Sequence, residues 1–394
     1  MLMKGIRKFI ALALAVSTAA SVSAPVSAAG KSFNDVYADS SFSLLRHSMK
    51  SGRNCLISPA SAFVAVSMAQ LGASGKTRSE MEKAFGGLST EKTASGLSKL
   101  VRRASKSGTA VFRCPSSVWY RKKAVSVKES YASVLKKRYS ASIKGADFNS
   151  RTARDVNSWV SRNTEGKIKS VIDRINPSDR IILVNAAYFK GQWLEPYSGA
   201  KKRKFTKQNG NSEKVPMLEG SENEYFEVGG AKCFAKEYAG GRFSFVAVLP
   251  PKGTSVKSFL SKTSGSDVMK AYKGRRTSDV VVRTRIPKFR YSFETSLKKP
   301  LGKLGIKRAF TNSASFRNMT KSDVRIDDAV HKTFIALDEN GTEAAAVTAL
   351  VMKANSVGFR KPEVKTIYLN RPFLYEIVES DTGLPLFVGV VADP

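Results

Sequence analysis

The chain has few of the residues that build metal sites, disulfide frameworks or catalytic triads. Its 394 residues include only three cysteines and two histidines. The cysteines, Cys55, Cys114 and Cys233, are too few and odd in number for a disulfide framework, and a single disulfide is the alternative to three free thiols. Neither histidine accompanies a G-x-S-x-G elbow, and no Cys/His cluster has metal-ligand spacing. We therefore expect no metal site, no cofactor and no enzyme activity.

Long apolar runs are also absent. No stretch after residue 28 approaches the ~20 apolar residues that a transmembrane helix needs. The N-terminus has the form of a secretory signal, since three basic residues precede a short apolar stretch and Val26–Ala28 offers small residues for cleavage. We predict that residues 1–28 are a signal peptide, that residues 29–394 form the mature domain, and that the protein is secreted without a membrane span. A retained anchor is the alternative.

Acidic residues are half as common as basic ones. The chain has 32 Asp and Glu against 66 Lys and Arg, for a formal net charge of +34. Removal of residues 1–28 takes away three positive charges and no acidic residue, which leaves +31. This excess predicts attraction to polyanions. A generally basic surface that keeps the protein soluble is an equally good interpretation.

One group of basic residues has helical spacing. Its members stand at positions i, i+3, i+4 and i+7, which share one face of a helix: Lys99, Arg102, Arg103 and Lys106. Apolar residues repeat with the same spacing on another face, which is typical of an amphipathic surface helix. We interpret this group, called the basic helix face below, as a candidate polyanion site, with a solvated helix face as the alternative.

Helix and strand signals alternate irregularly along the chain, without repeats or a low-complexity linker. Ser58-Pro59 has the residues of an N-cap and a first helical position and opens a buried helix to Leu71. The apolar run Ile181–Phe189 is typical of a central strand. Phe373–Val378 and Leu386–Val391 read as a strand pair. The pattern predicts one mixed α+β domain.

Several short motifs are weak alone and specific in their combined order. They are Asn54–Ser61, Leu71–Ala73, Asn157–Ile168, Leu183–Gly191 with Trp193, Ile286–Phe289, Val330–Lys332, Arg371–Phe373 and Phe387–Gly389. Together they resemble the serpin family over about residues 40–394. The composition of the predicted signal peptide is typical of a bacterial secreted member. The resemblance implies a single domain with three β-sheets and about nine helices. Its large central sheet would accept the reactive loop as an extra strand.

The resemblance also implies roles for polar residues around the point where that sheet opens. A group that we call the sheet-opening cluster matches the family pattern: Ser58, Ser61, Asn185, His331, Trp193 and Lys288. The first four would form a buried hydrogen-bonded network that breaks and reforms as strands part. Trp193, Lys288 and Glu339 would lie at the top of the sheet, where insertion begins. Ordinary core polarity is the alternative.

The reactive centre loop is expected at about residues 339–362. Its hinge matches the family at Glu339, Gly341, Thr342, Glu343, Ala344, Ala345 and Ala346. Alternate residues from Thr342 to Ala354 carry no charge, whereas Glu343 and Lys353 fall in the other set, so one face of a strand can be buried while the other stays wet. No proline interrupts 341–361, so every amide can join a ladder. A plain long strand is the alternative.

The family spacing places the reactive bond between Asn355 and Ser356. The downstream anchor at Pro362 stands about three residues farther from the hinge than the family pattern predicts, so cleavage after a residue of 351–354 stays open. These bonds suit trypsin-, elastase-, chymotrypsin-, subtilisin- or papain-like proteases. The resemblance implies a monomeric suicide inhibitor of serine proteases, with papain-like cysteine proteases as further targets. Heparin-like glycans would bind the basic helix face. The alternatives are a non-inhibitory carrier and a glycan- or surface-binding serpin.

Overall fold

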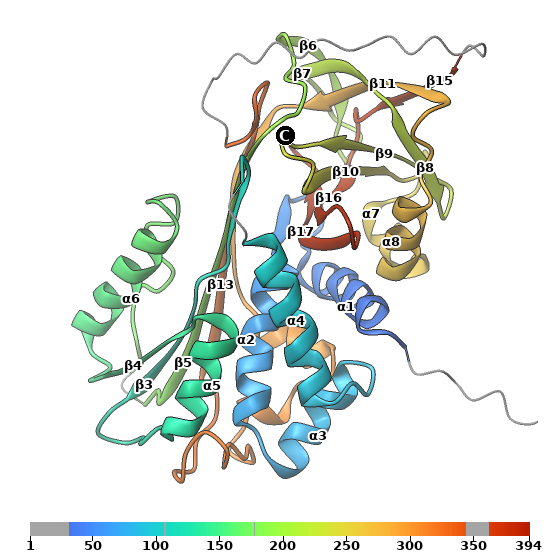
Figure 1. The fold of residues 1–394 in the computed structure, drawn as a ribbon. Coiled ribbons are helices and arrows are strands. Elements are labelled where there is room, and N and C mark those ends of the chain that lie inside the picture. The colour runs from blue at the N-terminus through green and yellow to red at the C-terminus, as the bar shows by residue number, and fades with distance from the viewer. Residues whose placement is uncertain (1–30, 106–107, 177, 344–361) are drawn as a thin grey trace, which may run out of the picture. The chain divides into compact units, whose positions relative to one another are not determined.

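The computed structural model describes residues 31–105, 108–176, 178–343 and 362–394. The predicted signal peptide, residues 1–28, lies outside the described residues. Within the described residues the chain forms nine α-helices and three β-sheets, which confirms the predicted fold (Figure 1). The helices are α1 (Phe33–Ser48), α2 (Pro59–Gly72), α3 (Gly75–Ala84), α4 (Thr90–Ala104), α5 (Glu129–Tyr139), α6 (Ser150–Asn163), α7 (Val256–Lys262), α8 (Gly265–Lys273) and α9 (Lys298–Lys303).

The central sheet has seven strands. Six of them follow the order β12-β13-β14-β5-β3-β4, and the seventh, β2, pairs with β5. These strands are β2 (Val111–Arg113), β3 (Ser116–Arg121), β4 (Ser142–Ala146), β5 (Ile181–Gln192), β12 (Phe289–Ser296), β13 (Asp328–Leu337) and β14 (Gly341–Thr342). The two long strands β5 and β13 run parallel, and six residue pairs join them, from Asp328↔Ile182 to Thr333↔Ala187.

Two smaller sheets complete the architecture. One has the order β1-β17-β16-β10-β9-β8, with β1 (Cys55–Ile57), β8 (Glu224–Val228), β9 (Ala231–Glu237), β10 (Phe243–Leu249), β16 (Phe373–Glu379) and β17 (Leu384–Val391). The other has the order β15-β11-β7-β6, with β6 (Ala200–Thr206), β7 (Ser212–Glu222), β11 (Val280–Pro287) and β15 (Glu363–Tyr368). The C-terminal strands β16 and β17 pair antiparallel, as their sequence predicts.

Both faces of the central sheet are covered, which explains why β5 is a continuous apolar run. Figure 1 shows α6 on one side of this sheet and α2 on the other. Alternate residues of β5 divide accordingly. Ile182, Val184 and Ala186 belong to a hydrophobic cluster with α6 residues, whereas Leu183 and Phe189 belong to the main core.

Helix α2 is the buried helix that the sequence predicts. Ser58 caps it by accepting a hydrogen bond from the Ser61 N–H, and Pro59 takes the first turn, where a missing N–H costs nothing. The helix contains no charged residue, and all of it except Leu71 is buried. This burial fixes the N-terminus of α2 beneath β5 and β13.

Three further observations concern the described part of the chain. All three cysteines are described, and none is in a disulfide. Among the described helices none is long and apolar enough to cross a bilayer. The described residues also contain no cluster of His, Cys, Asp and Glu that could hold a metal ion.

Candidate functional site

The hinge of the loop enters the central sheet as the short strand β14. After β13 the chain turns back, and Gly341 and Thr342 pair antiparallel with Gln192 and Gly191 of β5. On its other side Thr342 pairs with Leu337 of β13. The hinge therefore lies between β5 and β13, the two strands that would separate to admit more of the loop.

A glycine is required at the tightest point of this turn. Gly341 has φ +152°, and a Cβ at this position would lie 2.1 Å from the carbonyl oxygen of Gly191. The Asp338 carboxylate organises the turn by accepting hydrogen bonds from the N–H groups of Asn340 (2.9 Å) and Gly341 (3.3 Å). Close backbone approach, rather than flexibility, is the reason for glycine here.

Thr342 is the first loop residue whose side chain enters the core. It is 1% exposed, and its Oγ1 lies 2.6 Å from the hydroxyl of Tyr238. Tyr238 stacks on Trp193 with ring centroids 4.4 Å apart. The Trp193 indole N–H donates to the carbonyl of Asp338 (3.0 Å), so one aromatic pair holds both sides of the turn.

Glu343 departs from the expectation that its face of the loop remains exposed to solvent. Its side chain is only 4% exposed, and its carboxylate lies 3.3 Å from Lys167 Nζ, just beyond the end of α6. The second carboxylate oxygen has no hydrogen-bond partner among the described residues. Lys167 belongs to the turn that follows α6, so this turn contributes to the cover over Glu343. Glu343 also has φ +54°, a left-handed conformation that is uncommon for a residue with a side chain.

Two ion pairs flank the entrance. Lys288 Nζ lies 2.8 Å from the Glu339 carboxylate. Burial alone raises the pKa of Glu339, but the hydrogen bond and charge of Lys288 outweigh it, so this pKa lies below its usual value. The second pair, Lys236 with Glu222 at 3.1 Å, is nearly buried, and the Lys236 ammonium also lies over the Tyr197 ring. Sequence reasoning missed the second pair, because the surrounding residues give no signal that this lysine is buried.

The deeper part of the sheet-opening cluster lies around the start of α2. The Ser58 N–H donates to His331 Nε2 (3.1 Å), and the Ser58 hydroxyl donates to the carbonyl of Leu386 (2.8 Å). The Ser61 hydroxyl reaches the carbonyl of Ala186 on β5 (3.3 Å). His331 is fully buried, and this burial lowers its pKa to about 3. The imidazole is therefore neutral and accepts at Nε2.

The cluster is not the single connected network that the sequence predicts. Asn185 donates to the Ser116 hydroxyl (2.7 Å) on the opposite side of β5 from β13. Its Oδ1 and the Nδ1 of His331 both lack a hydrogen-bond partner among the described residues, although the two residues are opposite each other in the β5–β13 register. Since His331 accepts at Nε2, Nδ1 carries the proton. One buried donor and one buried acceptor thus lie unsatisfied on the strands that would part.

The basic helix face is only partly free for a polyanion. Arg103 forms ion pairs with Glu379 (3.1 Å) and Asp381, so its charge is already compensated. Lys99 and Arg102 are exposed on α4. Lys106 lies outside the described residues. The pairing of Arg103 was not predictable locally, because its partners lie more than 270 residues farther along the chain.

Several predicted site residues cannot be placed. Ala344, Ala345 and Ala346 of the hinge, and the reactive bond Asn355–Ser356, lie outside the described residues. The described chain resumes at Pro362, and β15 then pairs in parallel with β11 in the four-stranded sheet. The two ends of the loop are thus anchored in two different sheets.

Comparison with known proteins agrees with this geometry. The model of a family described as Serpin (serine protease inhibitor) matches residues 35–394. An uncharacterised serpin-like protein of Thermococcus kodakarensis is 30% identical over 364 residues, which cover 90% of this chain and 84% of the relative.

Solved structures separate two states of the fold. The chain superposes on the crystal structure of the thermophilic serpin tengpin in its native state with a TM-score of 0.85, 32% identity and coverage of 92% and 94% of the two chains. With tengpin in its latent state the TM-score is 0.77, at 30% identity and coverage of 91% and 96%. Members of the matching family are generally protease inhibitors rather than catalysts. From the match over nearly its whole length, the chain belongs to the serpin family.

Proposed function

We propose that this protein is a secreted suicide-substrate inhibitor of serine proteases. The observation that carries the proposal is the position of β14, which places the first loop residues between β5 and β13. A loop cleaved downstream of this point can continue down the same gap as a new strand. The chain needs no catalytic group of its own, because the protease supplies the nucleophile.

The register of β14 indicates where each loop residue would go. Thr342 lies opposite Leu337 and Gly191, and the six pairs between β13 and β5 keep the same offset. Continuing this antiparallel register places residue 346 at the Thr333↔Ala187 pair and residue 351 at the Asp328↔Ile182 pair. Insertion of residues 346–351 would replace one parallel pairing by two antiparallel ones.

The same register explains the composition of both loop faces. Even-numbered residues from Thr342 onward would point into the main core, as Thr342 does. Odd-numbered residues would lie on the side of α6, where Ile182, Val184 and Ala186 already form an apolar cluster. The odd-numbered loop residues from 345 to 351 are alanine and valine, so burial beneath α6 leaves no charge unpaired. In the same register Lys353 would lie beyond the Asp328↔Ile182 pair.

The proposed chemistry is that of an interrupted peptide hydrolysis. The protease serine attacks the carbonyl of the residue before the cleaved bond, and the amine of the next residue leaves as a new N-terminus. The loop, still esterified to the protease, then inserts. Asn355 stands thirteen positions after Thr342, so the ester would travel roughly 40 Å along the sheet at strand spacing. Distortion of the protease then prevents hydrolysis of the ester.

A panel of trypsin-, elastase-, chymotrypsin-, subtilisin- and papain-like proteases tests the proposal. We expect a complex with at least one serine protease that survives a denaturing gel, and mass spectrometry of the released C-terminal peptide defines the cleaved bond. A stable complex with the papain-like enzyme would extend the targets to cysteine proteases. Cleavage of the loop by every active protease without any stable complex would refute inhibition by this route.

The same experiment separates inhibition from the carrier alternative. We expect that cleavage of the loop raises the melting temperature strongly, because the cleaved strand enters the sheet. An unchanged melting temperature after cleavage would favour a non-inhibitory binding protein. Secretion is tested by N-terminal sequencing of protein from the culture medium, where a start at residue 29 is expected. Gel filtration with light scattering tests the proposed monomer.

A further inference from the structure

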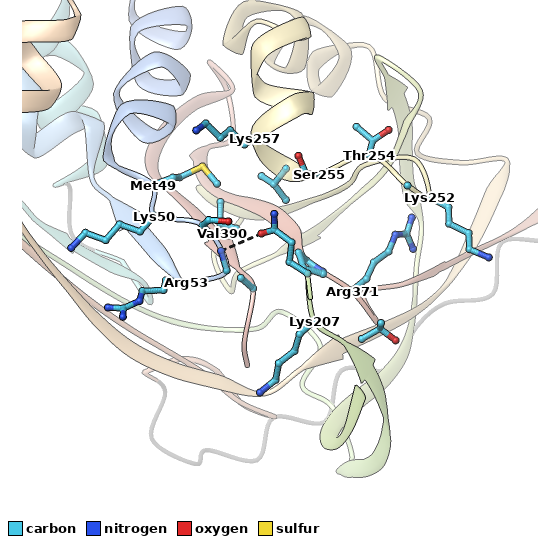
Figure 2. A pocket seen from close by; sticks show the side chains of 18 of the residues that line it. Met49, Lys50, Arg53, Lys207, Lys252, Thr254, Ser255, Lys257, Arg371 and Val390 are labelled. Atoms are coloured by element: carbon cyan, nitrogen blue, oxygen red, sulfur yellow. Dashed lines mark hydrogen bonds between the residues drawn. The ribbon is translucent and has the colours of Figure 1, made fainter. Parts of the chain in front are cut away.

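A cavity of about 590 Å³, lined by none of the hinge residues, lies where five parts of the chain meet. Its walls come from the segment after α1, the turn between β6 and β7, the residues before and at the start of α7, the segment before β16, and the end of β17 (Figure 2). The size is within the range of small-molecule sites.

The walls are joined across the cavity by one side chain. Gln208, in the turn between β6 and β7, accepts a hydrogen bond from the Gly52 N–H through its Oε1 (3.2 Å), which is the dashed line in Figure 2. Met49, Val256 and Val390 contribute apolar surface. The cavity therefore has an apolar lining and a hydrogen bond that joins two of its walls, so it is not merely a gap between exposed loops.

The charge of the lining is one-sided. Six basic residues line the cavity and no acidic residue does: Lys50, Arg53, Lys207, Lys252, Lys257 and Arg371. Lys207 is compensated by Glu213 and Asp393. The other five form no ion pair with any described residue. Figure 2 shows the labelled basic side chains around the margin of the cavity, with Lys50 and Arg53 on one side and Lys252 and Arg371 on the other.

Arg371 is the least solvated of these cations. It is partly buried, and its guanidinium donates to the carbonyl of Pro250 (2.7 Å) rather than to a carboxylate. Burial lowers its pKa from the usual value. A cation held in this way retains donors of a planar fork, the geometry that suits phosphate and sulfate.

We infer that this cavity binds a small, multiply charged oxyanion, an oligophosphate or a sulfated oligosaccharide unit. The number of uncompensated cations favours several negative charges on one ligand, since a monocarboxylate would leave most of them without a partner. The open rim lets the flexible lysines close around ligands of different length. The inference goes beyond protease inhibition and does not depend on it. It also moves the favoured polyanion contact from the basic helix face to this cavity.

Calorimetry on the mature protein tests the inference with sodium tripolyphosphate and with a fully sulfated heparin disaccharide as separate titrants. We expect saturation at one site per chain for at least one titrant, and the tighter of the two identifies phosphate or sulfate as the preferred group. Affinity should fall several-fold between about 50 and 200 mM salt, because exposed charges are screened. Octanoate serves as an apolar monocarboxylate and should bind at least tenfold more weakly.

A matched pair of variants locates the site. Arg53→Ser with Lys252→Ser removes two exposed charges from opposite sides of the rim and should weaken binding at least tenfold. Lys99→Ser with Arg102→Ser removes the same charge from α4 and should change affinity less than threefold. Equal weakening by both pairs would show that net charge alone drives binding. That result, saturation by neither titrant, or octanoate binding as tightly as tripolyphosphate would overturn the inference.

Discussion

Thr342 Oγ1 and the Tyr238 hydroxyl lie 2.6 Å apart, in a pocket that the Trp193 ring closes. This contact joins the first inserted residue of the loop to β9 and β10 through the residue that follows β9. Thr342 is buried and its hydroxyl contacts Tyr238, so a longer side chain here would have to displace the tyrosine or leave the sheet. The size and charge of residue 342 should therefore control the rate of insertion.

We predict that Thr342→Arg converts the inhibitor into a substrate. A guanidinium at this 1% exposed position would be buried without a carboxylate beside it, at a cost of several kcal/mol. Insertion would then be slower than hydrolysis of the acyl-enzyme. A denaturing gel should show rapid cleavage and no covalent complex. Thr342→Ser keeps the hydroxyl and should form the complex normally, and an unchanged complex with arginine would contradict the prediction.

We predict that Lys167→Met loosens the hinge. The Glu343 carboxylate is 4% exposed and would lose its ion-pair partner, which leaves a nearly buried charge uncompensated. The unpaired carboxylate would destabilise the closed hinge by about 1–3 kcal/mol, and this penalty disappears when the hinge leaves the sheet and Glu343 becomes solvated. The Glu343 N–H, which donates to the carbonyl of Ala336 (2.9 Å), should then exchange with deuterium at least five times faster.

Lys169→Met is the matched control for this change. Lys169 is also exposed and basic, two residues farther along, and it forms no ion pair with a described residue. Its loss should leave exchange at residue 343 unchanged. Equal exchange rates in the two variants would show that the ion pair does not hold the hinge.

The pKa of His331 makes stability depend on pH. In the unfolded chain the imidazole titrates near its usual pKa of about 6.5, whereas in the folded protein burial lowers the pKa to about 3. Between these values the unfolded state binds a proton that the folded state excludes. Stability is therefore lost as pH falls below about 6.5, by up to about 1.4 kcal/mol per pH unit.

Unfolding midpoints in guanidinium chloride at pH 7 and pH 5 measure this effect. We expect a larger fall for the native sequence than for His331→Gln, which cannot take up the proton. His47→Gln controls for the other histidine, which is partly exposed. Identical falls in the native protein and His331→Gln would show that the buried imidazole is not the cause.

The family resemblance, together with local sequence patterns, was sufficient to predict the fold. The N-cap at Ser58 and the apolar run of β5 are local signals, and each lies where the sequence pattern places it. The small residues after Gly341 are a local signal too, but Ala344, Ala345 and Ala346 lie outside the described residues. The pattern could not reveal which outer faces are covered. Glu343, for example, is paired with Lys167, which lies 176 residues earlier in the chain.

The sequence pattern also did not predict which charged residues form ion pairs. The helical spacing of Lys99, Arg102 and Arg103 correctly describes a shared helix face. It does not show that Glu379 is opposite Arg103, nor that Lys236 is buried with Glu222. Such pairs form between distant segments, so they require the tertiary structure. For the same reason the basic lining of the 590 Å³ cavity, assembled from four segments, has no sequence signature.

Thr348 lies outside the described residues, but the register of β14 indicates which residues it would contact after insertion. Six residues after Thr342, it would lie between His331 and Asn185. At this position His331 Nδ1–H is an unsatisfied donor and Asn185 Oδ1 is an unsatisfied acceptor among the described residues. One hydroxyl can accept from the first and donate to the second.

Insertion would therefore satisfy two buried polar atoms that have no hydrogen-bond partner in the described part of the chain, at a net gain of about 1–3 kcal/mol. We predict that Thr348→Val, which has the same shape without the hydroxyl, reduces the rise in melting temperature after loop cleavage. Thr348→Ser retains the hydroxyl and should preserve most of the rise. The uncleaved proteins should melt alike, because in the proposed mechanism insertion follows cleavage. A valine variant with the full rise would show that Thr348 does not reach His331 and Asn185, and that the inserted strand follows a different register.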